Sequence, residues 1–228
     1  IAHELGTPLN AISGHLHLLM EDSKLDPKAQ GRLKVVEAQV DRLTLIIRDV
    51  LKTMQMPPPH FGAINLNHVV EDIAGLVSPV VRSRKIRLET QLGRDLPLIP
   101  ADADQLEQVL MNLLTNGMDA MSGGGTLTVT TSFVPVEEAA RLTSESPGNH
   151  LRINVTDSGE GMEEETLQRI FEPFFSTKQT GAGTGLGLSI CRQIMKSHGG
   201  TITVSSVKGK GTTFSILLPV ERERVVVG

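Results

Sequence analysis

The sequence has no tryptophan and no tyrosine, and its six phenylalanines bring the aromatic fraction to only 3%. The core must therefore be built from leucine, isoleucine, valine and methionine, and little is available for stacking on nucleic-acid bases. The net charge of −4 offers a polyanion no overall electrostatic attraction. These features together argue against a nucleic-acid partner.

Cysteine is nearly absent as well, because Cys191 is the only one among 228 residues. An internal disulfide is excluded, which suits a reducing compartment, and we expect a cytoplasmic location. No apolar run reaches the ~18 residues of a membrane span, and no signal peptide is recognisable. Because the chain starts at Ile1, inside an apparent helix, we expect a fragment whose sensor or membrane segments lie upstream.

The first helix is predicted from Ile1 to about Glu21, where apolar residues recur at alternating spacings of four and three. At 100° per residue, His3 lies almost opposite this apolar stripe. His3 therefore faces solvent if the stripe faces a core. The stripe consists of Leu5, Leu9, Ile12, Leu16 and Leu19.

The second helix is predicted from about Lys28 to Thr53, with a three–four heptad spacing that indicates a coiled-coil seam. A two-helix hairpin alone buries little surface, whereas two copies would form a four-helix bundle. We therefore predict a homodimer through the hairpin. The alternative is that the helices pack on the rest of their own chain. The seam residues are Leu33, Val36, Val40, Leu43, Ile47, Val50 and Met54.

Prolines and glycines divide the chain into a hairpin at 1–55, a proline-rich linker at 56–63, a domain at 64–220 and a tail at 221–228. Helices and strands alternate in the domain, which predicts an α/β sandwich with a mixed sheet and helices on one face. The expected helices are 65–83, 102–121, 162–171 and 186–197, the expected strands are 86–92, 126–133, 151–156, 201–206 and 212–219, and 134–150 is expected to be a surface loop.

One expected helix carries Asn112, Asn116 and Asp119 at spacings of four and three, which place their side chains on one face. Amide oxygens and a carboxylate suit Mg²⁺, which prefers oxygen ligands. The same pattern is also typical of the polar outer face of an amphipathic helix.

Two glycine-containing motifs follow. Asp157-Ser-Gly-Glu-Gly161 ends a strand, where the aspartate can accept from an adenine amino group, although such a pattern is often only a turn. Gly181-Ala-Gly-Thr-Gly-Leu-Gly187 opens a helix, and backbone N–H groups at a helix N-terminus bind phosphate. It is neither a Walker A loop nor a dinucleotide fingerprint.

Three of the six phenylalanines lie in Phe171-Glu-Pro-Phe-Phe-Ser-Thr-Lys178. They could pin the base of the glycine-rich segment, and Lys178 could reach a phosphate. The alternative is a hydrophobic patch that docks a loop, with Lys178 in solvent.

In this order and spacing, the asparagine-bearing helix, D-x-G-x-G, F-x-P-F-F and G-T-G-L-G-L resemble a known ATP-binding domain. Sensor histidine kinases, gyrase-type topoisomerases, mismatch-repair ATPases and heat-shock chaperones share it. The opening AHELGTPLNAI resembles the phosphoacceptor box of sensor histidine kinases, which the other members lack. The resemblance extends from Ile1 to about Val220. It implies a dimerisation and phosphotransfer hairpin followed by a catalytic ATP-binding domain.

The resemblance assigns roles to the opening residues. It implies that His3 is phosphorylated on an imidazole nitrogen, that Glu4 is the base that polarises it, and that Thr7 positions water when the partner is dephosphorylated. Many relatives carry Arg or Asn–Asn in place of Gly6-Thr7, which leaves the partner geometry open.

The resemblance also implies ATP and Mg²⁺ as cofactors. Asn116, helped by Asn112, would hold Mg²⁺, and Asp157 would read the adenine amino group with Thr212 nearby. Many relatives carry a basic residue where this chain has Asp119, so Lys178 becomes the main candidate for a charge on the phosphates. The residues that would line the nucleotide and its lid are Gly159, Gly161, Gly183, Thr184, Gly185, Leu186, Gly187 and Leu188.

The predicted function is ATP-dependent autophosphorylation of His3 and relay of the phosphoryl group to an aspartate of a response-regulator receiver domain, in two-component signal transduction. Dephosphorylation of that partner is a further activity that the resemblance allows. One alternative is a conformational ATPase of the gyrase or chaperone type, but the hydrolytic glutamate expected at Asn112 is missing. The other is a dimeric nucleotide-binding scaffold without transfer, against which intact His3, Glu4, Asn116 and Asp157 argue.

Overall fold

The computed structural model of the chain describes residues 11–12, 14–16, 18–20, 26–54, 58–143, 148–178 and 184–221. The chain divides into two compact units. One comprises Ile1–Pro57 with Glu172–Leu186, and the other comprises Pro58–Phe171 with Gly187–Gly228.

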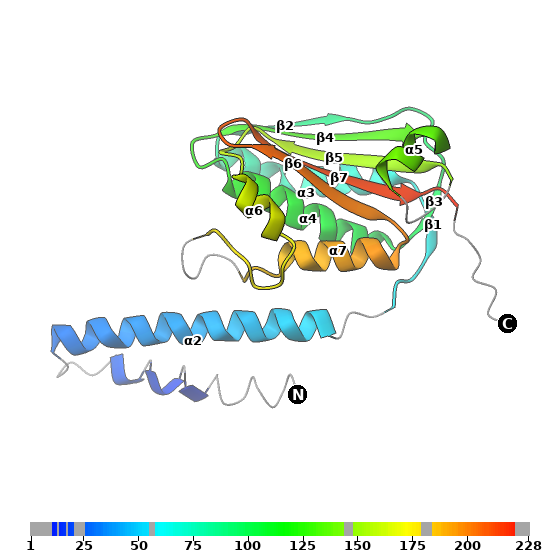
Figure 1. Cartoon of the computed structure of the whole chain (residues 1–228). Helices are drawn as coiled ribbons and strands as arrows, with labels where there is room; N and C mark the ends of the chain where they lie inside the picture. Colours follow the sequence, from blue (N-terminus) through cyan, green and yellow to red (C-terminus); the bar gives the residue numbers. More distant parts are fainter. Residues whose placement is uncertain are drawn as a thin grey trace. The chain divides into compact units, whose positions relative to one another are not determined.

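The described residues between 11 and 54 in the first unit are largely helical. Residues 11–12, 14–16 and 18–20 are helical, and α2 spans Pro27–Met54 (Figure 1). Asp26 precedes α2, and its carboxylate accepts a hydrogen bond from Ala29 N–H at 2.7 Å, as an N-cap does. The predicted second helix is therefore confirmed. Among the described helices, none combines the length and apolar character that a membrane crossing needs.

The second unit is built on a mixed five-stranded sheet in the order β2-β4-β5-β7-β6. The β2–β4 pair is parallel, and the other three pairs are antiparallel. A separate antiparallel pair joins β1 (Gly62–Ile64) to β3 (Ile99–Ala101), which the sequence did not predict because three residues carry no periodicity. The strands of the main sheet are β2 (Ile86–Gln91), β4 (Gly125–Val134), β5 (His150–Asp157), β6 (Thr201–Val207) and β7 (Gly211–Pro219).

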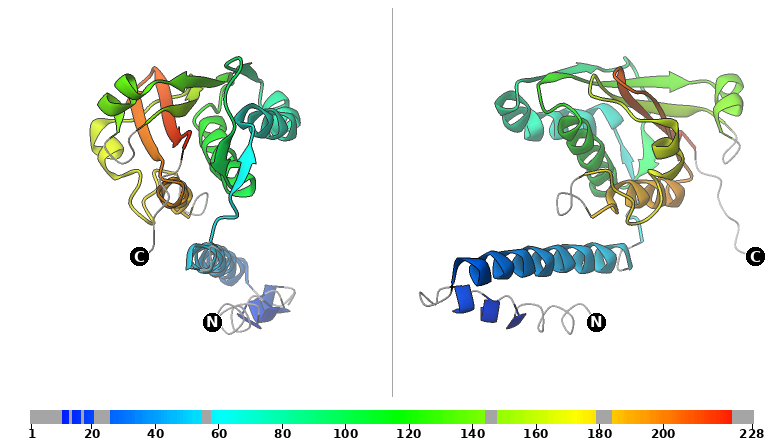
Figure 2. Two further views of the ribbon diagram at one scale, coloured as in Figure 1. Left: turned by 90° about the vertical axis from the view of Figure 1, so that its right-hand side faces the viewer. Right: turned by 60° about the vertical axis from the view of Figure 1, so that its left-hand side comes forward.

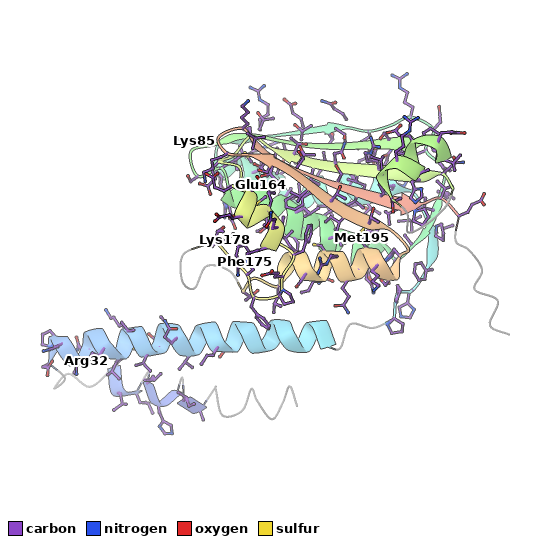
Figure 3. The ribbon with its side chains drawn as sticks, viewed as in Figure 1. Arg32, Lys85, Glu164, Phe175, Lys178 and Met195 are labelled. Carbon is purple, nitrogen blue, oxygen red and sulfur yellow. The ribbon has the colours of Figure 1, made fainter. Side chains whose placement is uncertain are left out.

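Three helices cover one face of this sheet: α3 (Leu66–Ser83), α4 (Ala103–Asp119) and α7 (Gly187–Ser197). α4 lies between the other two and packs against both (Figure 2). Met195 on α7 (Figure 3) is 1% exposed, as are several leucines of α4. The predicted mixed sheet with helices packed on it is confirmed. The core leucines of α4 are Leu106, Leu110, Leu113 and Leu114.

The prediction of a surface loop at 134–150 is wrong in part, because Val136–Leu142 form a short helix, α5. Ala139 of α5 is 1% exposed and packs in one cluster with Val134 and Leu217. Side chains alternate along a strand, and both cluster partners occupy positions that face away from α4. α5 therefore covers the end of the opposite sheet face. A second short helix, α6, spans Glu164–Arg169, within the predicted range.

Candidate nucleotide-binding site

Asp157 is the last residue of β5, a central strand of the sheet, and only 5% of its surface is exposed. Its Oδ1 accepts a hydrogen bond from Gly159 N–H at 2.8 Å, and the carboxylate also accepts from the Thr212 backbone. Burial raises the pKa of Asp157 above its ordinary value, and these two hydrogen bonds lower it by less. The side chain is thus an oriented acceptor at a strand end.

α4 passes directly over this strand end because residue 117 is glycine. A Cβ atom at Gly117 would lie 2.8 Å from Leu127 Cδ1 and 3.3 Å from Asp157 Cβ. A side chain there would push α4 off the sheet or displace the carboxylate. Sequence reasoning missed Gly117, although its place directly after Asn116 on the asparagine-bearing helix was an available signal.

The loop after Asp157 is held against neighbouring backbone at both ends. Glu160 N–H donates to the Ala120 carbonyl at 3.2 Å, which ties the loop to the end of α4. Gly161 has a φ of +61°, and a side chain there would collide with the Val207 carbonyl. Only glycine adopts this conformation without strain, so the loop can turn beneath the β6–β7 hairpin.

Asn112 joins α4 to the start of α7. Its Nδ2 donates to the Gly187 carbonyl at 3.3 Å and to Cys191 Sγ at 3.7 Å. Both bonds use the amide nitrogen, so the amide oxygen is the atom with which Asn112 can serve a cation. Cys191 is fully buried, which raises the pKa of its thiol to about 12 and confirms a packing role rather than a reactive one.

The polar face of α4 continues with Asn116 and Asp119. Asn116 is half-buried, and its backbone carbonyl accepts from Ala120 N–H at 3.0 Å. Asp119 Oδ1 accepts from Arg84 Nη1 at 2.7 Å. Sequence reasoning missed Arg84, which lies 35 residues before its partner. The acidic residue at position 119 is therefore already paired with a guanidinium group.

In the first unit, the connection between α6 and α7 carries Phe175 and Lys178 (Figure 3). Phe174 N–H donates to the Gly185 carbonyl at 3.0 Å, which joins the phenylalanine cluster to the C-terminal part of the glycine-rich segment. Lys178 N–H donates to Ser176 Oγ at 3.2 Å. Leu186, just before α7, is 4% exposed.

The structure therefore gathers part of the predicted site. Asp157, Gly159, Gly161 and Thr212 meet at one end of the sheet, beside α4. Gly187 contacts Asn112, and Leu188 lies half-buried in the first turn of α7. Lys178, Thr184, Gly185 and Leu186 belong to the first compact unit. Outside the described residues lie His3, Glu4, Thr7 and Gly183.

Residues 101–222 match the family of histidine kinase-, DNA gyrase B- and HSP90-like ATPases, and residues 1–56 match the His Kinase A phosphoacceptor domain. The chain belongs to the sensor histidine kinases. The resemblance inferred from its motifs is thereby confirmed.

The chain is 36% identical over 226 residues to the sensor histidine kinase ZraS of Escherichia coli (strain K12). The aligned residues make up 98% of this chain and 45% of ZraS. Full-length ShkA in complex with AMPPNP matches 98% of the chain and 45% of its own, with 25% identity and a TM-score of 0.69. The structure of histidine kinase ThkA in complex with response regulator protein TrrA matches 96% of this chain and 60% of the ThkA chain, with 25% identity and a TM-score of 0.66. The chain spans about half the length of the curated relatives it matches.

The donor set of the site suits a hard cation that retains water. The described part of the chain contains no group of three or more His, Cys, Asp or Glu side chains that could hold a metal. Asn112 and Asn116 offer amide oxygens instead, and Mg²⁺ is usually bound through few protein ligands together with waters and substrate phosphates. These residues therefore fit Mg²⁺ delivered with a nucleotide.

Proposed function

We propose that this chain is an ATP-dependent protein-histidine kinase that phosphorylates His3 and passes the phosphoryl group to an aspartate of a response-regulator receiver domain in two-component signalling. The observation that carries the proposal is the oriented, buried carboxylate of Asp157 beside α4, in a chain whose residues 1–56 match a phosphoacceptor domain. The solved complex of ThkA with its response regulator supports the choice of partner.

The geometry of the second unit supports nucleotide binding. Asp157 accepts from the adenine amino group, and Gly159 and Gly161 let the base approach the backbone. The amide oxygens of Asn112 and Asn116 would hold Mg²⁺, which when bound would neutralise charge on the phosphates. Because Asp119 is paired with Arg84, we assign the protein's own positive charge on the phosphates to Lys178.

The glycine-rich residues would form a lid that contributes to nucleotide binding. Gly183 and Thr184 would contribute backbone N–H groups to the phosphates, as such segments do before a helix. Gly185, whose carbonyl fixes Phe174, would anchor the end of this lid. Leu186 and Leu188 would pack at the lid's junction with α7.

Phosphoryl transfer then requires little beyond positioning. A neutral imidazole nitrogen of His3 forms a bond to the γ-phosphorus, the bond from that phosphorus to the bridging oxygen breaks, and ADP leaves. Glu4 orients the imidazole and accepts its proton. Thr7 would position water for the reverse task of dephosphorylating the partner.

The hairpin is the proposed homodimer interface. At the predicted seam of α2, Val36 is 46% exposed and Leu43 is 51% exposed. On the predicted stripe of the first helix, Ile12 and Leu19 are 47% and 51% exposed. Apolar residues exposed in register on a helical hairpin favour a second copy, which would complete a four-helix bundle.

We further propose the organisation expected from the sequence: hairpin at 1–55, linker at 56–63, ATP-binding domain at 64–220 and tail at 221–228. This catalytic portion would work in the cytoplasm, and any membrane attachment would come through upstream segments. The negative net charge and scarce aromatics argue against nucleic acid as a partner.

Incubation with γ-labelled ATP and Mg²⁺ tests the kinase assignment. The parent chain should incorporate acid-labile, base-stable label, and His3→Gln should incorporate none. Addition of the cognate receiver domain should drain label from the kinase onto the receiver. Label that persists in His3→Gln would falsify the assignment of His3. ATP turnover at equal rates in parent and His3→Gln, without label on either, would instead indicate the conformational ATPase.

A further inference from the structure

The end of the predicted linker is held by a buried carboxylate. Asp102 is 7% exposed, and its two oxygens have separate partners. Oδ1 accepts from Gln105 N–H at 3.1 Å and caps α4, whereas Oδ2 accepts from the linker's His60 N–H at 2.7 Å. One side chain thus starts the asparagine-bearing helix and binds the linker.

His198, directly after α7, completes this contact from the other side. It is 1% exposed, its Nε2 accepts from Asp102 N–H at 3.0 Å, and its Nδ1 lies 2.9 Å from the Ile194 carbonyl. Because a backbone N–H can only donate, Nε2 carries no proton, and Nδ1 donates to Ile194. The ring of Phe61 meets the ring of His198 edge to face, with centroids 5.0 Å apart. We call Asp102, His198, His60 and Phe61 the linker clasp.

Backbone pairing extends the clasp along the chain. Directly after Phe61, β1 pairs with β3 in antiparallel register, with Gly62 opposite Ala101. The segment from His60 to Ile64 is therefore bound continuously to the unit that contains α4 and α7. The sequence predicted a hinge over residues 56–63, and the structure attaches the last part of that range to the ATP-binding unit.

The two helices that bear the clasp also bear nucleotide-site residues at their other ends. α4 starts at the clasp and carries Asn112 and Asn116 about three and four turns further on. α7 ends at the clasp and begins at Gly187, whose carbonyl accepts from Asn112. The clasp is therefore separated from the nucleotide site but joined to it by two packed helices.

We propose that the linker clasp is a positioning device for phosphoryl transfer. It makes His60–Ile64 a rigid arm of the ATP-binding domain, and it takes no part in holding the nucleotide. This inference rests on the proposed kinase function. A stiffer arm restricts the orientations in which the bound nucleotide can meet the acceptor, which raises the effective concentration of the productive arrangement.

Asp102→Asn tests the clasp without removing the helix cap. The amide oxygen still accepts from Gln105 N–H, but an NH₂ group replaces Oδ2 and opposes the donor of His60. Asp104→Asn is the matched control, because Asp104 is exposed in the first turn of the same helix and the change in charge is the same. Phe61→Leu is a second variant that leaves Asp102 intact.

The parent and the three variants, each with all 228 residues, should show three results. Hydrogen–deuterium exchange at the amides of His60 to Gly62 rises about tenfold in Asp102→Asn, because a protecting acceptor is lost. The Kd for an ATP analogue stays within about twofold of the parent, while autophosphorylation at saturating ATP slows about fivefold because the arm is loose. Phe61→Leu shows a smaller change in the same direction, and Asp104→Asn behaves like the parent.

Unchanged hydrogen–deuterium exchange in Asp102→Asn would show that Asp102 does not hold the linker. Faster exchange with an unchanged rate of autophosphorylation would show that holding the linker does not position the ATP-binding domain. A loss of nucleotide affinity that accounts for the slower rate would also overturn the inference. If the parent itself incorporates no phosphate, the proposed function fails and the positioning role falls with it. The exchange experiment still decides in that case whether the clasp holds the linker.

Discussion

At the scale of single residues, Asp157, the proposed adenine acceptor, is buried at a cost to stability in its ionised form. Burial raises its pKa, so the folded protein disfavours the ionised carboxylate relative to the unfolded chain. The hydrogen bonds from Gly159 and Thr212 offset only part of this effect. The ionised form is nevertheless the better acceptor for an adenine amino group.

Asp157→Asn should therefore weaken nucleotide binding. The amide keeps the shape of the side chain but replaces one acceptor oxygen with a donor, which opposes the adenine amino group. A hydrogen bond to a charged acceptor contributes roughly 1.5–3 kcal/mol, so the Kd for ATP should rise at least about tenfold. Equilibrium titration with a fluorescent ATP analogue measures this. An unchanged Kd would remove Asp157 from adenine recognition.

The same variant should stabilise the nucleotide-free protein at neutral pH. Since the folded pKa of Asp157 is the higher one, the ionisation penalty is absent well below the ordinary value of 3.8 and complete above the folded pKa. Asp157→Asn removes that penalty, so its Tm should exceed that of the parent at pH 7 by a margin that shrinks as the pH falls toward 3.8. Thermal unfolding at several pH values tests the sign, and a variant less stable than the parent at pH 7 would contradict it.

At the scale of elements, α5 covers the end of the sheet face on which the sequence predicted no helix. Its attachment depends on Ala139, which packs with Val134 and Leu217. The Arg152–Glu138 pair, with N and O 2.6 Å apart, is partly exposed and adds only about 0.2–1 kcal/mol. Burial of one small side chain therefore matters more for this helix than its charges.

Ala139→Asp should destabilise the ATP-binding domain by about 2–3 kcal/mol, because it places an unpaired charge among apolar side chains. Ala140→Asp is the matched control: Ala140 is exposed on the same helix, and its substitution should change stability by less than about 0.5 kcal/mol. Urea unfolding measures both. Equal effects of the two substitutions would show that α5 does not pack on the sheet as the structure has it.

At the scale of the whole molecule, the proposed dimer would assemble through side chains that one copy leaves exposed. Val35 and Val36 are neighbours on α2 and are 62% and 46% exposed. Only Val36 belongs to the predicted heptad seam, because a helix turns 100° between them. Substituting each of these two valines in turn therefore distinguishes a dimer interface along the seam from a surface that is merely apolar.

Val36→Glu should weaken dimerisation at least about 100-fold, because each dimer would bury two unpaired carboxylates at its seam. Val35→Glu introduces the same charge outside the seam and should leave the dimer intact. Sedimentation velocity over a range of concentrations measures the dissociation constant of each variant. Identical behaviour of the two variants would contradict an interface along the heptad seam.

The sequence by itself determined the features that depend on local spacing. The heptads predicted α2, and the helices expected at 65–83 and 102–121 match α3 and α4 within about two residues. The order of the short motifs was sufficient to identify the family, because each motif is contiguous in the chain.

Tertiary structure decided what depends on contacts between distant residues. Arg84 pairs with Asp119 across 35 residues, and His198 binds the Asp102 amide across 96, and neither pair leaves a periodic signal. α5 was missed because a seven-residue helix with two exposed glutamates has too short an apolar face to stand out, and its one buried contact forms only when strands β4 and β7 lie in register. Such contacts follow from how helices and strands pack, which local spacing does not encode.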